Sequence, residues 1–94
     1  MRADIDRDGT IAFRDELILF YYRTQFSILN GTPDYVLSIT EEVCDQDECI
    51  SALDIDRDAT IAFRDELILF YYRTNYALLN TTYPDYVQWI ESCA

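Results

Sequence analysis

The chain has 94 residues, with 18 acidic and 7 basic side chains, so its formal net charge is −11. All the cations are Arg, and Lys and His are both absent, which excludes His-dependent catalytic dyads, His-ligated zinc and an imidazole general base. The negative net charge excludes a surface that binds nucleic-acid phosphates or anionic lipids electrostatically. Half of the residues are apolar and 15% are aromatic, so the chain is a compact domain rather than an acidic disordered tail.

The chain also lacks the sequence signals of a membrane protein and of a zinc or redox site. Its longest unbroken apolar run, residues 17–22, is far shorter than the roughly 20 residues that span a bilayer. The charged residues that follow Met1 do not resemble a signal peptide. Cys44, Cys49 and Cys93 form no CxxC motif. Three cysteines allow one disulfide, in any of three pairings. We prefer a disulfide near the acidic segment in the middle of the chain, and small buried thiols are the alternative.

An internal repeat organises the chain. Residues 4–24 read DIDRDGTIAFRDELILFYYRT and residues 54–74 read DIDRDATIAFRDELILFYYRT, so the two segments differ only at Gly9 and Ala59. A weaker likeness continues beyond them. Self-similarity of this kind indicates two copies of one structural unit that pack together. We therefore expect a single domain, 1–94, made of repeat 4–44, an acidic connector 45–53 and repeat 54–93.

Each repeat predicts a loop, a long helix, a turn and a short helix, in that order. Residues 13–26 are rich in apolar side chains and contain no Gly or Pro, as a helix requires, and the second repeat matches them. Residues 30–33 and 80–84 predict turns. Short helices are expected over 35–43 and 86–91. Each turn opens on an Asn that also begins a glycosylation sequon, although a helix-ending turn residue is the simpler interpretation.

Each repeat begins with an acidic loop of twelve residues. Oxygen-bearing residues occupy positions one, three, five, seven and twelve, where position seven would contribute its backbone carbonyl. This is the pattern of a calcium loop, in which alternate side chains converge on one hard cation. The expected ligands are Asp4, Asp6, Asp8, Thr10 and Asp15 in the first loop and Asp54, Asp56, Asp58, Thr60 and Asp65 in the second.

Two other interpretations of these acids are weaker. The first is a solvated acidic turn with no bound cation, in which the crowded carboxylates would repel one another. A catalytic pair of carboxylates must face each other across a substrate cleft, whereas these lie at alternate positions of one short segment. We therefore expect no enzyme and no small-molecule substrate. Two bound Ca²⁺ ions would change the formal charge from −11 to −7, and most of the remaining acids surround the connector, which we expect to be solvated.

Two details distinguish the loops from common calcium loops. Position twelve is Asp rather than the longer Glu, so closure of the site by both carboxylate oxygens is less assured. Position six is Gly9 in the first loop but Ala59 in the second. If the turn needs a positive φ there, the Cβ of Ala costs on the order of 1–2 kcal/mol. We therefore expect the second site to be strained and weaker.

The order of loop and helix suggests a family. An EF-hand sensor has a helix on both sides of each loop, whereas only residues 1–3 precede the first loop here. Two loop–helix units, DIDRDGTIAFRD and DIDRDATIAFRD with the helix after each, resemble a dockerin. The resemblance implies an all-α fold of two pseudo-symmetric calcium loop–helix (F-hand) repeats, with long antiparallel helices plus short connector and C-terminal helices. The two repeats depart from the common dockerin pattern by Asp at position three and Glu directly after position twelve.

The resemblance also implies a function. Dockerins are non-catalytic modules that bind the cohesin domain of a scaffoldin and so attach their parent protein to an extracellular bacterial cellulosome, which degrades polysaccharides. Loop positions ten and eleven would lie at the cohesin contact; they are Phe13, Arg14, Phe63 and Arg64. The alternative is an EF-hand-like calcium buffer or sensor with no cohesin partner. A structural homodimer that uses the same aromatic residues is a third possibility.

The long helices carry two apolar faces, although a surface helix needs only one. One face then belongs to the core, and the other is either also core or a partner surface. Its aromatic and Arg content favours a partner surface. The expected partner residues are Phe13, Arg14, Leu17, Phe20 and Tyr21, and Phe63, Arg64, Leu67, Phe70 and Tyr71. Because the copies are nearly identical, we expect two equivalent faces that bind one partner in orientations related by about 180°; use of a single face is the alternative. The last-turn Arg of each helix, Arg23 or Arg73, either belongs to this surface or, as the alternative, complements the helix dipole.

Overall fold

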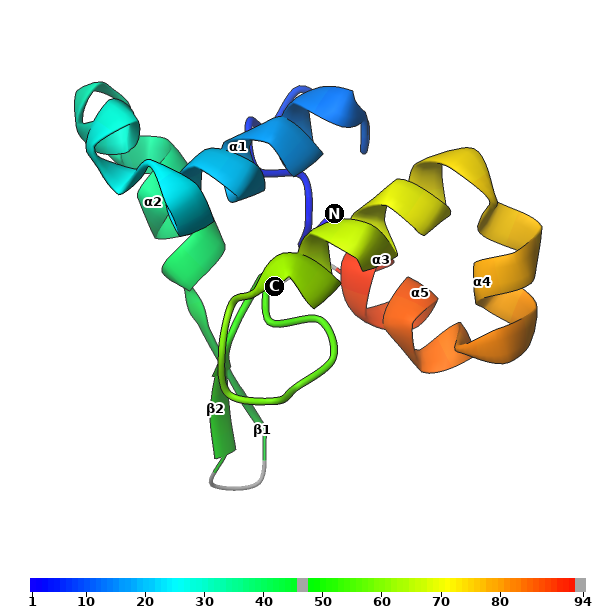
Figure 1. The fold of residues 1–94 in the computed structure, drawn as a ribbon. Helices are drawn as coiled ribbons and strands as arrows, with labels where there is room; N and C mark the ends of the chain where they lie inside the picture. Colours follow the sequence, from blue (N-terminus) through cyan, green and yellow to red (C-terminus); the bar gives the residue numbers. More distant parts are fainter. Residues whose placement is uncertain (46–47, 93–94) are drawn as a thin grey trace.

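The computed structural model describes residues 1–45 and 48–92 and is mostly helical (Figure 1). Its Cα extents are 37 × 33 × 23 Å. The elements are α1 (Phe13–Thr24), the 3-10 helix η1 (Phe26–Gly31), α2 (Pro33–Thr40), β1 (Glu42–Asp45), β2 (Glu48–Ser51), α3 (Phe63–Thr74), α4 (Tyr76–Thr82) and α5 (Pro84–Glu91). A long helix follows each acidic loop, as predicted, and a small β-hairpin separates the two repeats.

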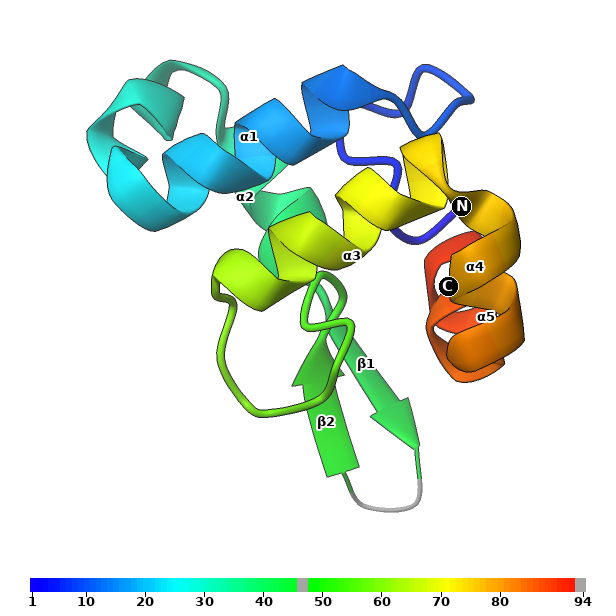
Figure 2. The same ribbon diagram turned by 45° about the vertical axis from the view of Figure 1, so that its right-hand side comes forward.

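Helices α1 and α3 pack against each other, and α2 contacts α1 and lies behind both helices in the view of Figure 2. Arg73, in the last turn of α3, bonds to Glu16 in the first turn of α1 at 2.9 Å. Arg23, in the last turn of α1, bonds to Glu66 in the first turn of α3 at 3.0 Å. These reciprocal contacts place the two helices antiparallel about a pseudo-twofold axis. The two Arg side chains, for which the sequence left a partner surface and the helix dipole open, join the two repeats.

Several helix boundaries differ from the prediction. The first long helix ends at Thr24 because Gln25 has φ −142° and ψ 61°, outside the helical region, so Phe26 begins η1 instead. The predicted turns over 30–33 and 80–84 are shorter, since η1 continues to Gly31 and α4 to Thr82. The prolines that follow begin α2 and α5. Proline suits the first helical position, because it has no N–H to contribute and its φ is already helical.

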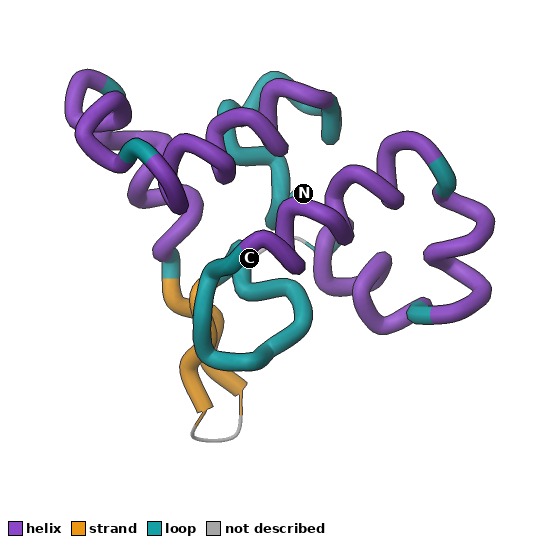
Figure 3. The backbone as a smooth tube through the Cα atoms, viewed as in Figure 1, coloured by secondary structure: helices purple, strands orange, loops and turns teal. Residues whose placement is uncertain are grey.

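The expectation of a helix through residue 43 is wrong, and the fold is mostly rather than purely helical; Glu41 and Glu42 beside the connector are exposed, as expected. Helix α2 ends at Thr40, and β1 pairs with β2 in an antiparallel hairpin (Figure 3). Val43 lies opposite Ile50, and such β-branched pairs stabilise a ladder. Cys44 and Cys49 are opposite each other and form a disulfide, which is typical of proteins outside the cytoplasm. Cys93 lies outside the described residues.

The core is built from both repeats. The segment that enters the first loop pairs with the end of α5, through Ala3 N to Ile90 O at 3.2 Å. The segment that enters the second loop pairs with the end of α2, through Leu53 N to Ile39 O at 3.3 Å. The largest fully buried apolar side chains are Ile5, Leu19, Ile39, Leu53, Ile55, Leu69 and Ile90. Each repeat thus completes the core of the other. Among the described residues, no helix has the length and apolarity needed to cross a membrane.

Candidate metal centres and an apolar groove

The backbone of each acidic loop folds back on its first Asp. Gly9 has φ 93° and Ala59 has φ 74°, so the positive φ expected at position six is confirmed in both loops. The Gly9 amide donates to Asp4 Oδ2 at 2.8 Å, and the Ala59 amide donates to Asp54 Oδ2 at 2.9 Å. This turn places the amide at position six on the carboxylate of the first Asp of each loop.

The last Asp of each loop braces the loop against the helix that follows it. Asp15 is fully buried, and its Oδ1 accepts from the Ile5 amide at 2.8 Å while its Oδ2 accepts from the Ala12 amide at 2.9 Å. Asp65 repeats these contacts with the corresponding amides at 2.9 Å each. A carboxylate in the first turn also interacts favourably with the helix dipole. Position twelve therefore fixes both the loop and the start of α1 or α3.

The carboxylates gather in both loops, and more completely in the second. Oxygens of all four second-loop acids lie within 4.8 Å of one another; these acids are Asp54, Asp56, Asp58 and Asp65. The corresponding first-loop group contains Asp4, Asp6 and Asp8. Thr10 is exposed, and both its amide and its hydroxyl donate to Asp8 Oδ1, at 3.0 and 3.2 Å; Thr60 does the same for Asp58. The two Thr residues therefore orient the acid at position five.

The donor set fits a hard cation. Asp4 Oδ1 and Asp56 Oδ1 are buried and have no hydrogen-bond partner among the described residues, and an unpaired buried carboxylate oxygen is costly. Burial, together with the charge of Asp56, raises the pKa of Asp65 to about 7, and burial raises the pKa of Asp54 to about 6. All these ligands are oxygens, which Ca²⁺ prefers. The acidic clusters are thus candidate metal sites.

The raised pKa values predict an unusual pH dependence for the metal-free protein. The folded states of Asp15, Asp54 and Asp65 have pKa values of about 6, 6 and 7, against 3.8 for an unperturbed Asp. The folded chain therefore binds more protons than the unfolded chain between about pH 4 and 7, so the free energy of unfolding falls as the pH rises through that window. Urea unfolding in calcium-free buffer at pH 4.5 and 7.5 measures this. A metal-free protein that is more stable at pH 7.5 would contradict it.

A second prediction concerns the strain at Ala59. Replacing Ala59 with Gly removes a Cβ from a backbone at positive φ, and Gly9→Ala adds one where it meets no atom within 4 Å. We expect A59G to stabilise the calcium-loaded protein and G9A to destabilise it, each by about 1 kcal/mol. Gly31→Ala is the matched control, because its added Cβ also meets no atom within 4 Å and its φ is not positive. Denaturant unfolding checks all three, and equal effects of G9A and G31A would refute the explanation.

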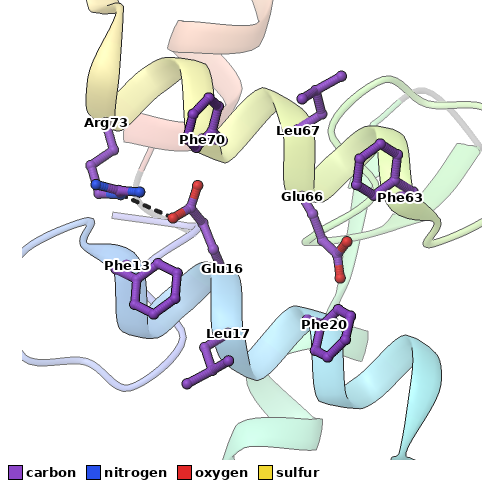
Figure 4. A pocket seen from close by; sticks show the side chains of 9 residues that line it. All are labelled: Phe13, Glu16, Leu17, Phe20, Phe63, Glu66, Leu67, Phe70 and Arg73. Carbon is purple, nitrogen blue, oxygen red and sulfur yellow. Dashed lines mark hydrogen bonds and ion pairs between the residues drawn. The ribbon is translucent and has the colours of Figure 1, made fainter.

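The predicted partner residues divide between one shared groove and its surroundings. An apolar groove between α1 and α3 is lined by Phe13, Glu16, Leu17, Phe20, Phe63, Glu66, Leu67, Phe70 and Arg73 (Figure 4). Phe13 and Phe63 are each 58% exposed. Tyr71 instead lines a second hollow beside α4. Because the helices pack antiparallel, Phe and Leu side chains of both sets line this one groove, and binding of a partner by two equivalent faces stays a prediction.

The Arg at loop position eleven lies beside the acidic loop, and its predicted partner contact stays a prediction. Arg14 Nε lies 3.6 Å from Asp6 Oδ2, and Arg64 Nε lies 3.5 Å from Asp56 Oδ2. Both Arg side chains remain largely exposed. They sit over the acidic loops rather than in the groove lining.

Sequence reasoning missed the roles of Glu16 and Glu66. Both are buried, and each is paired with an Arg from the other repeat. The Arg73 guanidinium also lies 5.5 Å from the Phe13 ring and 5.7 Å from the Phe70 ring, within the range of a cation–π contact. The available signal was a Glu in the first turn of each long helix, accompanied by an Arg in the last turn of the same helix.

Trp89 was also missed. Its Nε1 donates to Ala52 O at 2.7 Å, and the Arg57 guanidinium lies 4.8 Å from its ring centroid. Arg57 belongs to the second acidic loop, so Trp89 connects that loop to α5.

No protein-family model, curated protein or solved structure matches this chain.

Proposed function

We propose that this protein is a non-catalytic, calcium-dependent interaction module of the dockerin type. It binds a cohesin domain and anchors its parent protein to an extracellular cellulosome scaffold. Each acidic loop holds one Ca²⁺ through the carboxylates of its Asp residues and the carbonyl of Thr10 or Thr60. The disulfide Cys44–Cys49 supports a location outside the cytoplasm.

One observation carries the proposal: the residue that completes each metal loop also braces a helix of the groove. Asp15 bonds to the amides of its own loop and to the start of α1, and Asp65 does the same for α3. Helices α1 and α3 supply the lining of the groove. Occupation of the loops is therefore linked to the placement of the partner surface, because metal binding and folding share the same ligands.

One experiment distinguishes the proposed cohesin-binding module from a calcium buffer. We expect capture of at least one member of a cohesin panel in calcium, loss of capture in chelator, and lower helicity by circular dichroism when calcium is removed. Calcium binding without capture of any cohesin would favour the buffer. Helicity and capture that are unchanged in chelator would refute the calcium dependence. A doubled mass of the isolated domain in light scattering would instead support the homodimer.

A further inference from the structure

The disulfide lies on the segment that leads into the second acidic loop. Cys49 is on β2, which ends at Ser51, and the first ligand of that loop, Asp54, follows shortly after it (Figure 3). Cys44 and Cys49 are both exposed, so a reductant in solution can reach the bond between them. The oxidation state of this bond therefore bears on the segment that positions the second loop.

Backbone hydrogen bonds carry the position of β2 into the loop. The Ala52 amide donates to Glu41 O at 2.8 Å, which continues the contact between the two segments of the hairpin beyond the strands. The Asp54 amide donates to Ser51 O at 2.9 Å. The first ligand of the second loop is thus bonded to the residue that ends β2.

Trp89 adds a side-chain contact at the same point. Its Nε1 donates to Ala52 O at 2.7 Å, and its ring centroid lies 4.8 Å from the guanidinium of Arg57, a residue of the second loop. Trp89 is the single Trp of the chain and is 8% exposed. Its fluorescence therefore reports on the junction between the hairpin and the second loop.

The first acidic loop is attached to a different element. The Arg2 amide donates to Ser92 O at 2.7 Å and the Ala3 amide to Ile90 O at 3.2 Å, at the end of α5. The Arg2 guanidinium also lies 4.2 Å from the centroid of the Trp89 ring, but this is a contact of a side chain. The backbone of the first loop is tied to α5, whereas the backbone of the second loop is tied to the hairpin.

The disulfide is the covalent restraint on a small hairpin. Strands β1 and β2 have four residues each, and a two-stranded hairpin by itself is at best marginally stable in water. Val43 and Ile50 pack against the core and are only partly buried. The rigidity of a loop is one of the properties that set its calcium affinity. Loosening of the hairpin therefore lowers the affinity of the loop that it leads into.

We propose that the Cys44–Cys49 disulfide is a redox-sensitive control on the calcium affinity of the second loop. A dithiol reductant supplies two electrons and two protons, so the Sγ–Sγ bond breaks, both cysteines become thiols, and the reductant becomes a disulfide. The second loop then binds calcium more weakly, whereas the first loop keeps its affinity. This inference rests on the proposed function, because it concerns calcium held in the loops.

Calcium titrations of the full chain, oxidised and then reduced with a dithiol, test the inference. The amide NMR signals of Gly9 and Ala59 distinguish the loops, since each amide donates to the first Asp of its own loop. We expect reduction to weaken calcium binding by about fivefold or more in the second loop and by less than about twofold in the first. Trp89 fluorescence should change on reduction. An equal change in both loops, or no change in either, would overturn the inference.

Variants separate loss of the disulfide from other effects of the reductant. Cys44→Ser and Cys49→Ser, made together, should show the weakened second loop without any reductant, and added dithiol should then change nothing further. Cys93→Ser is the matched control, because it removes a cysteine and keeps the disulfide, so it should respond to the dithiol as the unaltered chain does. A response to dithiol that persists in the double variant would overturn the inference. The comparison of the oxidised and reduced unaltered chain stands even if the double variant fails to fold.

The same titrations separate this inference from the proposed function. Calcium bound in both loops with affinities that reduction leaves unchanged refutes the redox control and leaves the calcium-dependent function standing. Absence of calcium binding in either oxidation state refutes the proposed function and this inference with it. A second loop weakened by reduction, without capture of any cohesin, supports the redox control and refutes the cohesin assignment.

Discussion

Removal of calcium is expected to lower the thermal unfolding temperature by about 20 °C or more. Saturation of one site at 100 times its dissociation constant adds about 2.7 kcal/mol to the free energy of unfolding, so two sites add about 5.4 kcal/mol. A domain of this size shifts by about 4–8 °C per kcal/mol. Without the cation, the buried Asp4 Oδ1 and Asp56 Oδ1 have no partner among the described residues. Circular dichroism melts in calcium and in chelator measure the shift.

The control for this experiment separates specific coordination from general screening of a −11 chain. Sodium chloride at equal ionic strength screens surface charge but supplies no divalent ion, so it should recover little of the loss. A Glu42→Gln variant lowers the negative charge at an exposed position of β1, and its response to calcium should match that of the unaltered chain. Recovery by sodium chloride alone would show that the acidic clusters are ordinary solvated turns.

The second large effect is expected from Asp65→Ala. Asp65 accepts from the amides of Ile55 and Ala62 at 2.9 Å and from that of Asp56 at 3.4 Å. Its loss leaves buried amides without an acceptor, and hydrogen bonds to a charged group contribute about 1.5–3 kcal/mol each. We expect the free energy of unfolding to fall by about 3 kcal/mol. In the metal-free protein the loss should be smaller, because removing one carboxylate also relieves the repulsion among the acids of the loop. Calcium binding should fall from two ions to one.

Asp15→Ala is the matched comparison, because it distinguishes loss of backbone bracing from loss of a metal ligand. Asp15 makes the same backbone contacts in the first loop but does not join the group of Asp4, Asp6 and Asp8 within 4.8 Å. Both variants should lose similar stability in metal-free protein, and Asp65→Ala should lose more calcium affinity. Denaturant unfolding and calorimetric calcium titration report the two quantities separately. Unchanged stability of both variants would refute the bracing role.

Much of the local structure was predictable because it depends on short-range chemistry. The repeat, the two acidic loops and the start of each long helix follow from residues close in sequence, and the positive φ at Ala59 follows from its alignment with Gly9. The hairpin was missed because the acidic composition of the connector suggested solvation. Its stability depends on the cross-strand pairing of Val43 with Ile50 and on the disulfide beside it, and a disulfide pairing is not determined by cysteine spacing alone.

The sequence by itself determined that the domain is a duplicated pair of acidic loop–helix units, since ligand spacing and apolar density are local properties. Only the tertiary structure decided how the two units meet. Antiparallel packing brings Arg73 onto Glu16 and Arg23 onto Glu66, and it turns two apolar faces that looked separate into one groove. The relative orientation of two helices depends on side chains that are about 50 residues apart, and no pattern within either repeat specifies it. The acidity apparent from the composition is therefore local in origin, whereas the apolar groove between α1 and α3 is a property of the assembled fold.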